Sequence, residues 1–162
     1  MTLSYREMTI ADIPAALALR VATIENAVTM EELEQDYEVT AESLAGAMQS
    51  AVRGWLCEDT AAEAASRVVG FAMGDRSGGE VLVVAVRPGC EGRGIGKSLL
   101  LQVQDWLFSE GFEEIWLLSN PDPAVRAHRF YRRLGWQATG RRKGGDEILT
   151  LRRPASERVG RR

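Results

Sequence analysis

The stretch VLVVAVRPGCEGRGIGKSLL, residues 81–100, contains an apolar run, then a glycine-rich turn, then apolar residues at helical spacing. This order predicts a strand that leads through a loop into the start of a helix. Gly92, Gly94 and Gly96 allow the backbone to approach a ligand closely, because they have no Cβ. The first turn of the helix adds free N–H donors and the positive end of the helix dipole. The segment therefore predicts a site for a phosphate or pyrophosphate.

Glycine spacing separates three kinds of phosphate-binding loop. A Walker A loop needs glycine five residues before the G-K-S triplet at 96–98, where the chain has Glu91, whose carboxylate would repel a triphosphate. A dinucleotide fingerprint needs glycine at 97 or 99, where the chain has Lys97 and Leu99. The remaining pattern, V-x-P-x-x-E-G-R-G-I-G-K from residue 86, resembles motif A of the GNAT superfamily of N-acetyltransferases. For this segment alone, a glycine turn without a ligand stays open as the alternative.

The resemblance implies that this segment binds acetyl-CoA, without a metal. Gly94 and Gly96 fall on the small positions of the family's motif. Glu91 departs from it, since Gln or Arg is usual there, and we expect its carboxylate to point away from the pyrophosphate. Arg93 and Lys97 then supply the positive charge. The residues that we expect at the cofactor are Val84, Ala85, Val86, Glu91, Gly92, Arg93, Gly94, Ile95, Gly96, Lys97, Ser98, Asn120 and Arg126.

A second pattern lies in residues 120–136, NPDPAVRAHRFYRRLGW. It predicts a helix with Asp122 as N-cap, Pro123 at the first position and Gly135 past the end. The apolar residues that share one face, predicted to be buried, are Ala127, Phe130, Tyr131 and Leu134. The spacing A-x-x-F-Y-x-x-x-G-W resembles motif B of the same superfamily, in which a tyrosine points at the sulfur of coenzyme A.

The resemblance implies that Tyr131 is the general acid that protonates the leaving thiolate. On this helix alone, an ordinary core tyrosine is an equal alternative. The family often has Asn seven residues before this tyrosine, where the chain has Ala124. Asn120, at the end of the preceding strand, is therefore our candidate for a polar contact to the pantetheine arm.

The implied reaction is direct attack of an amine on the thioester, with no covalent enzyme intermediate. Backbone N–H groups at the end of the strand at 81–86 would polarise the thioester carbonyl. An ammonium acceptor must lose a proton before it attacks, so a general base is required. The candidates are Glu80, beside this strand, and Glu25, in the first helix, with surface carboxylates as the alternative for both.

Length and composition bound the rest of the prediction. At 162 residues and 45% hydrophobic composition, we expect a single acetyltransferase domain over residues 1–153 and a disordered tail over 154–162. The longest aliphatic run has six residues, and the N-terminus has no signal-peptide pattern, so we expect no membrane association. Cys57 and Cys90 fit a reducing compartment. Together these features predict a cytoplasmic protein.

Charge is distributed unevenly along the chain. Residues 1–125 contain 20 acidic and 8 basic residues, a net charge of −12, whereas residues 126–162 contain 3 acidic and 12 basic residues, a net charge of +9. Seven acidic and no basic residues lie between 25 and 42, on what the resemblance implies is the acceptor side. This favours a cationic amine of a small molecule or peptide, with a solvated acidic face as the alternative. The arginines form no continuous stripe, so we expect no nucleic acid partner. We also expect that the protein can form a homodimer.

The order of predicted elements is that of an α/β protein with the GNAT fold: a mixed central sheet of about six to seven strands and about four helices. A noncatalytic acyl-CoA-binding sensor on this scaffold, and a P-loop-like nucleotide-binding protein, are the alternative functions. The strands are expected at 3–9, 54–58, 68–74, 81–86, 115–118, 136–141 and 146–152. The helices are expected at 11–26, 40–51, 94–110 and from 122 to 134, with a linker at 30–39.

Overall fold

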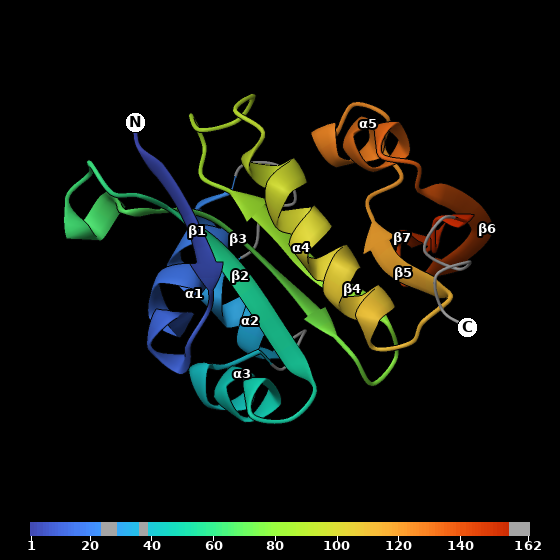
Figure 1. Cartoon of the computed structure of the whole chain (residues 1–162), viewed down its shortest axis with the longest axis horizontal. Helices are drawn as coiled ribbons and strands as arrows, with labels where there is room; N and C mark the ends of the chain where they lie inside the picture. The colour runs from blue at the N-terminus through green and yellow to red at the C-terminus, as the bar shows by residue number, and fades with distance from the viewer. Residues whose placement is uncertain (24–28, 36–38, 156–162) are drawn as a thin grey trace.

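The computed structural model describes residues 1–23, 29–35 and 39–155, arranged around one seven-stranded sheet (Figure 1). The strands are β1 Leu3–Glu7, β2 Val52–Asp59, β3 Val68–Asp75, β4 Glu80–Val86, β5 Glu114–Ser119, β6 Gln137–Lys143 and β7 Asp146–Arg152. The α-helices are α1 Ile13–Ala22, α2 Met30–Gln35, α3 Ala41–Met48, α4 Ile95–Ser109 and α5 Arg126–Arg133. The mixed sheet and the strand number confirm the predicted fold class.

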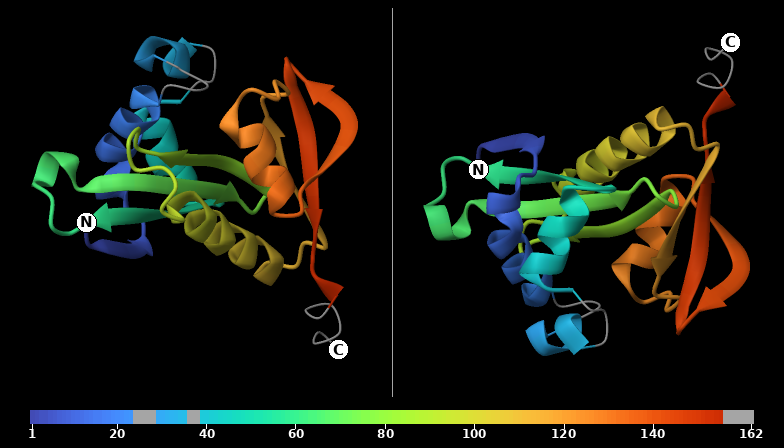
Figure 2. Two further views of the ribbon diagram at one scale, coloured as in Figure 1. Left: turned by 90° about the horizontal axis from the view of Figure 1, so that it is seen from above. Right: turned by 90° about the horizontal axis from the view of Figure 1, so that it is seen from below.

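The strand order in the sheet is β1-β2-β3-β4-β5-β7-β6. Neighbouring strands are antiparallel, except β4 and β5, which are parallel and joined through α4. This single crossover divides the sheet into two halves, which Figure 2 shows running in clearly different directions. The division matters for the site because β4 and β5 lie at the boundary.

Helices cover the two faces of the first half differently. On one face, Ala16 and Leu19 of α1 pack with β-strand residues such as Phe71. On the other face α4 packs alone, and its buried side includes the predicted apolar residues Leu99, Val103 and Leu107. Figure 2 shows α1 and α3 on one side of the strands and α4 on the other. The core therefore consists of two apolar layers separated by the sheet.

Two glycines of β3 set how closely α4 approaches the sheet. A Cβ at Gly70 would lie 2.8 Å from Ile95 Cγ2, and a Cβ at Gly74 would lie 2.7 Å from Val103 Cγ1. Real Cβ atoms do not approach other atoms so closely, since interiors are already close-packed. Glycine at these positions thus fixes the height of α4, and with it the position of the loop that precedes α4.

Two local predictions are wrong. Residues 30–35, expected in a linker, form α2, because Leu33 is buried against Ile13 and Leu17 of α1. The predicted N-cap Asp122 does not begin a helix. Its Oδ1 accepts a hydrogen bond from the Ala124 N–H at 2.9 Å and closes a turn, while α5 begins only at Arg126.

Three other predicted helix ends are confirmed, whereas α1 ends at Ala22 rather than at residue 26 and α3 ends at Met48 rather than at residue 51. Thr40 caps α3, where its hydroxyl accepts from the Ser43 N–H at 3.0 Å. Gly111 and Gly135 follow α4 and α5 with φ of 108° and 94°, the left-handed conformation that favours glycine after a helix. Most of the predicted C-terminal tail, residues 156–162, lies outside the described residues.

Strands β4 and β5 pair over only a short distance. The ladder between them consists of Glu80 with Trp116 and Val81 with Leu117. The register between β3 and β4 shifts at this point, so that Leu82 has no direct partner on β3. Beyond Val81 the edge of β4 that faces β5 has no strand partner among the described residues. The two strands therefore separate toward their carboxyl ends, just where the loop to α4 begins.

Candidate functional site

The loop between β4 and α4 is exposed and held open by glycines. Gly89, Gly92 and Gly94 have φ of 90°, 78° and 79°, and Gly94 is the N-cap of α4. The first intrahelical hydrogen bond of α4 runs from the Ser98 N–H to the Gly94 carbonyl at 3.0 Å. Within the described part of the chain, the amide groups of residues 92–97 donate to no protein group.

Such a run of free amides at a helix N-terminus favours an anion. The long α4 behind it adds its dipole. Arg93 and Lys97 are both exposed beside these amides, so that the positive charge predicted for the loop is available to a ligand. The geometry is that of a phosphate or pyrophosphate site built from backbone groups.

The carboxylate of Glu91 does not occupy this run of amides. Its Oε2 accepts a hydrogen bond from the Gly89 N–H at 2.9 Å and lies 3.9 Å from Arg126 Nη1 of α5. The acid is therefore held at the strand side of the loop and faces a cation. Its unfavourable charge is offset locally, although an exposed ion pair at this distance contributes little to stability.

The free edge of β4 continues the site away from the loop. Val84 and Val86 pack against the apolar layer under α4, whereas Ala85 is buried in the layer on the α1 side. Their backbone groups on the side of β5 have no ladder partner in the described part of the chain. A free strand edge offers N–H and C=O groups to an extended ligand that carries amides. Residues 84–86 thus lie on the strand that leads directly into the loop with the free amides, although the side chains of Ala85 and Ile95 are buried.

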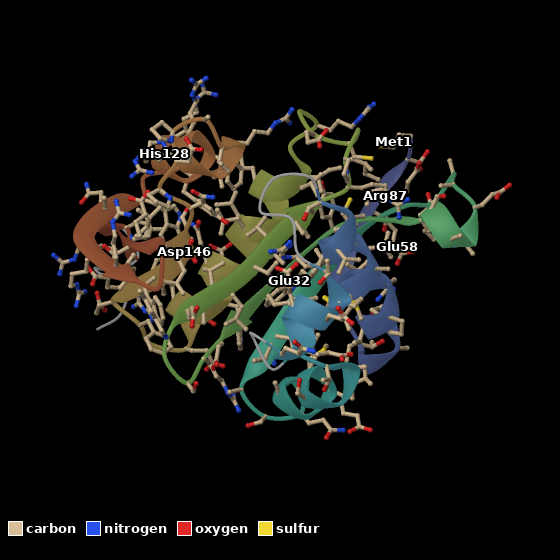
Figure 3. The ribbon with its side chains drawn as sticks, turned by 180° about the vertical axis from the view of Figure 1, so that it is seen from behind. Met1, Glu32, Glu58, Arg87, His128 and Asp146 are labelled. Atoms are coloured by element: carbon tan, nitrogen blue, oxygen red, sulfur yellow. The ribbon has the colours of Figure 1, made fainter. Side chains whose placement is uncertain are left out.

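Helix α5 borders the loop at the same end of the molecule. A Cβ at Gly96 would lie 3.4 Å from Phe130 Cζ, so Gly96 gives α5 room beside the start of α4. Figure 3 shows His128 of α5 and Arg87, the residue that follows β4, toward this same end. Tyr131 is the residue that directly follows Phe130 in α5.

Tyr131 is the one buried residue of α5, with 8% of its surface exposed. Its ring meets Phe130 edge-on at 5.1 Å between centroids and Trp136 at 6.1 Å. Burial raises the pKa of the phenol well above its ordinary value, because the charged phenolate is poorly solvated there. Tyr131 is therefore fully protonated near neutral pH and retains a proton that it can donate.

Asn120 lies directly after β5 and is already engaged in a turn. Its Oδ1 accepts a hydrogen bond from the Asp122 N–H at 2.9 Å. This Asx turn and the one made by Asp122 fill the segment before α5. The predicted contact between Asn120 and the pantetheine arm stays a prediction.

Of the two candidate bases, Glu80 and Glu25, only Glu80 lies among the described residues. Glu80 lies beside Val81, at the point where β4 and β5 begin to separate. Burial raises the pKa of its carboxyl, an effect opposed by Lys143. The loop at the other end of the strand is roughly 20 Å away, at about 3.3 Å per residue. Glu25 lies outside the described residues.

Sequence reasoning missed one partly buried polar contact. Arg132 Nη2 of α5 donates to Glu147 Oε1 of β7 at 2.7 Å. Glu147 occupies an inward position in the stretch DEILTL, in register with the buried Leu149. A charged residue at an inward position of an alternating strand is the signal that would have indicated this contact.

The described residues contain neither a candidate membrane span nor a candidate metal site. No helix among them has both the length and the apolar character of a membrane span. Residues 1–23, 29–35 and 39–155 contain no group of three or more His, Cys, Asp or Glu side chains arranged to hold a metal ion.

Free amides at a helix N-terminus beside a free strand edge are typical of a protein that binds an anionic, extended ligand. The family model described as "Acetyltransferase (GNAT) family" matches residues 21–136. This match covers well over half of the chain, and the chain belongs to the GNAT acetyltransferase family. The resemblance seen in the two motifs is confirmed, and the P-loop alternative receives no support.

Solved structures share the fold at low sequence identity. PaiA N-acetyltransferase from Thermoplasma acidophilum, in complex with coenzyme A, is 20% identical over 94% of this chain and 100% of its own, with a TM-score of 0.75. The ribosomal-protein-S18-alanine N-acetyltransferase from Escherichia coli is 18% identical over 93% and 94%, with a TM-score of 0.69. YncA from Salmonella typhimurium, with its cofactor acetyl-CoA, is 18% identical over 94% of each chain, with a TM-score of 0.69. A comparison with curated proteins finds no match.

Proposed function

We propose that this protein transfers an acetyl group from acetyl-CoA to the primary amine of a small molecule or peptide. The observation that carries the proposal is the run of free amides at residues 92–97, next to the free edge of β4. Family membership supports the chemistry. Structures of similar fold contain coenzyme A or acetyl-CoA, which supports the choice of cosubstrate.

The pyrophosphate would accept hydrogen bonds from the amides of residues 92–97, with Arg93 and Lys97 nearby. Arg126 would add charge from α5. The pantetheine arm carries two amides and would extend along residues 84–86 of β4, with Asn120 at its other side. This arrangement requires no metal.

In the reaction, the amine nitrogen attacks the thioester carbon and the carbon–sulfur bond breaks. Tyr131 donates its phenolic proton to the departing sulfur, and the second proton, which the nitrogen releases after its attack, returns to the phenolate through solvent. Burial raises the pKa of Tyr131, so the phenol carries its proton when the substrates bind. The proton of the ammonium acceptor must go to a base, for which Glu80 and Glu25 remain our candidates.

The acceptor is proposed to be cationic. Four of the seven acidic residues between 25 and 42 are described, and all four are exposed: Glu31, Glu32, Glu34 and Glu42. An acidic rim attracts an ammonium ion from solution. Beyond this amine, the proposed partner is a second copy of the chain. We propose neither a nucleic acid partner nor binding to a membrane. Two free, buried cysteines support a reducing location such as the cytoplasm.

Ligand binding is tested first, by the change in melting temperature with acetyl-CoA, CoA, ATP and NAD. We expect stabilisation by acetyl-CoA and CoA only, by about 2.7 kcal/mol at a hundredfold excess over Kd. Stabilisation by ATP or NAD alone would contradict the proposal. A sensor would bind acetyl-CoA equally well, so binding does not distinguish the two functions.

Catalysis is tested with radiolabelled acetyl-CoA and a panel of amines: spermidine, an aminoglycoside, free amino acids and a hexapeptide with an N-terminal alanine. Transfer of label to at least one amine is expected. Stabilisation by acetyl-CoA without transfer to any amine would favour the noncatalytic sensor.

A further inference from the structure

The ion pair between Glu147 and Arg132 is buried on the side of Glu147 only, since the Arg132 side chain is 32% exposed, and the carboxylate is incompletely satisfied. Glu147 is 9% exposed, and its Oε1 accepts from Arg132 Nη2 at 2.7 Å. Its second oxygen, Oε2, is enclosed and has no partner among the described residues. Directly opposite on β5 lies Ser119, 4% exposed, whose hydroxyl is also enclosed without a described partner.

Stability does not account for this arrangement. Removing a carboxylate from water costs several kcal/mol, and replacing a buried ion pair by apolar residues is often neutral or stabilising. An enclosed oxygen without a hydrogen bond adds roughly 1–3 kcal/mol to that cost. A role other than stability is therefore the better explanation for the pair.

Helix α5 needs an external anchor. It has only eight residues, its N-cap Val125 makes no side-chain cap hydrogen bond, and a single one of its residues is buried. Isolated helices of this length are not stable in water. Tertiary contacts must therefore fix both its position and its rotation about its own axis.

Arg132 connects the helix to the sheet at the relevant place. Its Nη1 donates to the His128 carbonyl of α5 at 3.1 Å, while its Nη2 reaches Glu147 of β7. Arg132 directly follows Tyr131, and successive residues of an α-helix are about 100° apart around the axis. Holding Arg132 against β7 thus fixes the direction in which Tyr131 points.

Glu147, the residue of the sheet in this contact, lies next to the place where β4 and β5 separate. Ser119, which pairs with Glu147, is the last residue of β5 and lies beyond the final pair with β4. We propose that Glu147, acting through Arg132, is a positioning residue that holds the Tyr131 hydroxyl toward the thioester bound between these strands. This inference rests on the proposed function, since it requires Tyr131 as the acid.

The test removes both charges, so that neither is left buried alone. In Arg132→Met/Glu147→Leu we expect a melting temperature close to that of the parent, KM for acetyl-CoA within about twofold, and a kcat lower by roughly tenfold with the panel amine that is acetylated fastest. Displacing a catalytic group by 1 Å can cost up to about a hundredfold. The matched control, Arg76→Met/Glu110→Leu, removes a surface pair 3.4 Å long and should leave kcat unchanged.

A double-mutant cycle separates positioning from general damage. If the pair acts through Tyr131, Arg132→Met/Glu147→Leu should cause no further loss of kcat once Tyr131→Phe is present. Losses that multiply, or an unchanged kcat in the paired variant, would overturn the inference. An unchanged kcat in Tyr131→Phe alone would instead show that Tyr131 is not the general acid. That result would contradict the proposed mechanism and is distinct from a failure of the Arg132–Glu147 pair.

A second measurement needs no acceptor. The protein has three tyrosines, so a ¹³C label at the phenol carbon can be assigned to Tyr131 with Tyr131→Phe. We expect the ¹³C chemical shift of Tyr131 at neutral pH to change in Arg132→Met/Glu147→Leu, because a rotated α5 moves the phenol relative to Phe130 and Trp136. The same chemical shift in both proteins would show that the pair does not fix the ring, and would overturn the inference.

Discussion

Helices α4 and α5 both border the proposed cofactor site, but they are held in place by different means. Helix α4 has 15 residues, eight of them buried, and packs against two glycines of β3. Helix α5 has eight residues, one of them buried, and depends on a few specific contacts. The first provides backbone amides and the second provides a side chain.

This difference suits the two tasks. Binding a pyrophosphate requires only that the amides of residues 92–97 keep their positions, which close packing of α4 ensures. Donating a proton requires one hydroxyl in one orientation, which small rotations of α5 would spoil. We therefore expect changes near α4 to affect stability and cofactor affinity, and changes near α5 to affect turnover.

The largest effect is expected for Tyr131→Phe. Removing the hydroxyl should lower kcat by roughly 10²–10⁴, the usual contribution of a general acid, and leave the affinity for CoA nearly intact. The ring packing with Phe130 and Trp136 is kept, so the melting temperature should change little. Steady-state kinetics and calorimetry with CoA measure the two quantities. A normal kcat would remove Tyr131 from the mechanism.

The next effect concerns the packing of α4. Gly70→Ala introduces a Cβ only 2.8 Å from Ile95 Cγ2 and 3.2 Å from the Ala85 carbonyl oxygen, and should destabilise the protein by about 1–3 kcal/mol. Urea unfolding measures the change. Gly46→Ala in α3 is the control, since a Cβ there meets nothing within 4 Å, and it should stabilise by about 0.5–1 kcal/mol. If Gly70→Ala is as stable as the parent, the close-packing argument is wrong.

The same comparison explains what the sequence could predict. The strand, glycine loop and α4 follow from periodicity and glycine placement, because their geometry is decided by local backbone preferences and an amphipathic face. The start of α5 could not be predicted from Asp122 and Pro123, since Asp122 uses its carboxylate to close a turn. Helix α2 was missed because only the contact of Leu33 with α1 makes it a helix.

The site was predictable to a similar degree. The amides of residues 92–97 were expected from motif A, since backbone groups depend little on distant residues. The contact of Glu91 with Gly89 and Arg126, and the pair of Arg132 with Glu147, join segments that are far apart in sequence or held by a turn. No periodicity or spacing specifies such partners, and only the folded structure brings them together.

A smaller effect is expected at the loop itself. Gly94 has φ of 79°, and a Cβ at this position would meet no atom within 4 Å, so Gly94→Ala introduces strain but no clash. The left-handed conformation costs a non-glycine residue about 1–2 kcal/mol, and we expect a roughly tenfold loss of CoA affinity in calorimetry. Gly78→Ala, which has neither a positive φ nor a close neighbour, is the control. Equal CoA affinity in both variants would mean that this glycine is not required by the loop.

The smallest effect tests the far end of β4, away from both helices. Burial raises the pKa of Glu80 in the folded state, so its contribution to stability is present below the unfolded pKa and is lost as pH rises through the folded one. Glu80→Gln should therefore match the parent in melting temperature near pH 4 and exceed it near pH 7. If Glu80 is also the general base, the kcat of Glu80→Gln is lower than that of the parent. The pH profile of the variant then lacks the decrease in kcat at acidic pH. If Glu80→Gln is instead less stable than the parent at pH 7, the folded protein favours the charged carboxylate of Glu80. Burial would then not raise the pKa of Glu80, and it could not make Glu80 a stronger base.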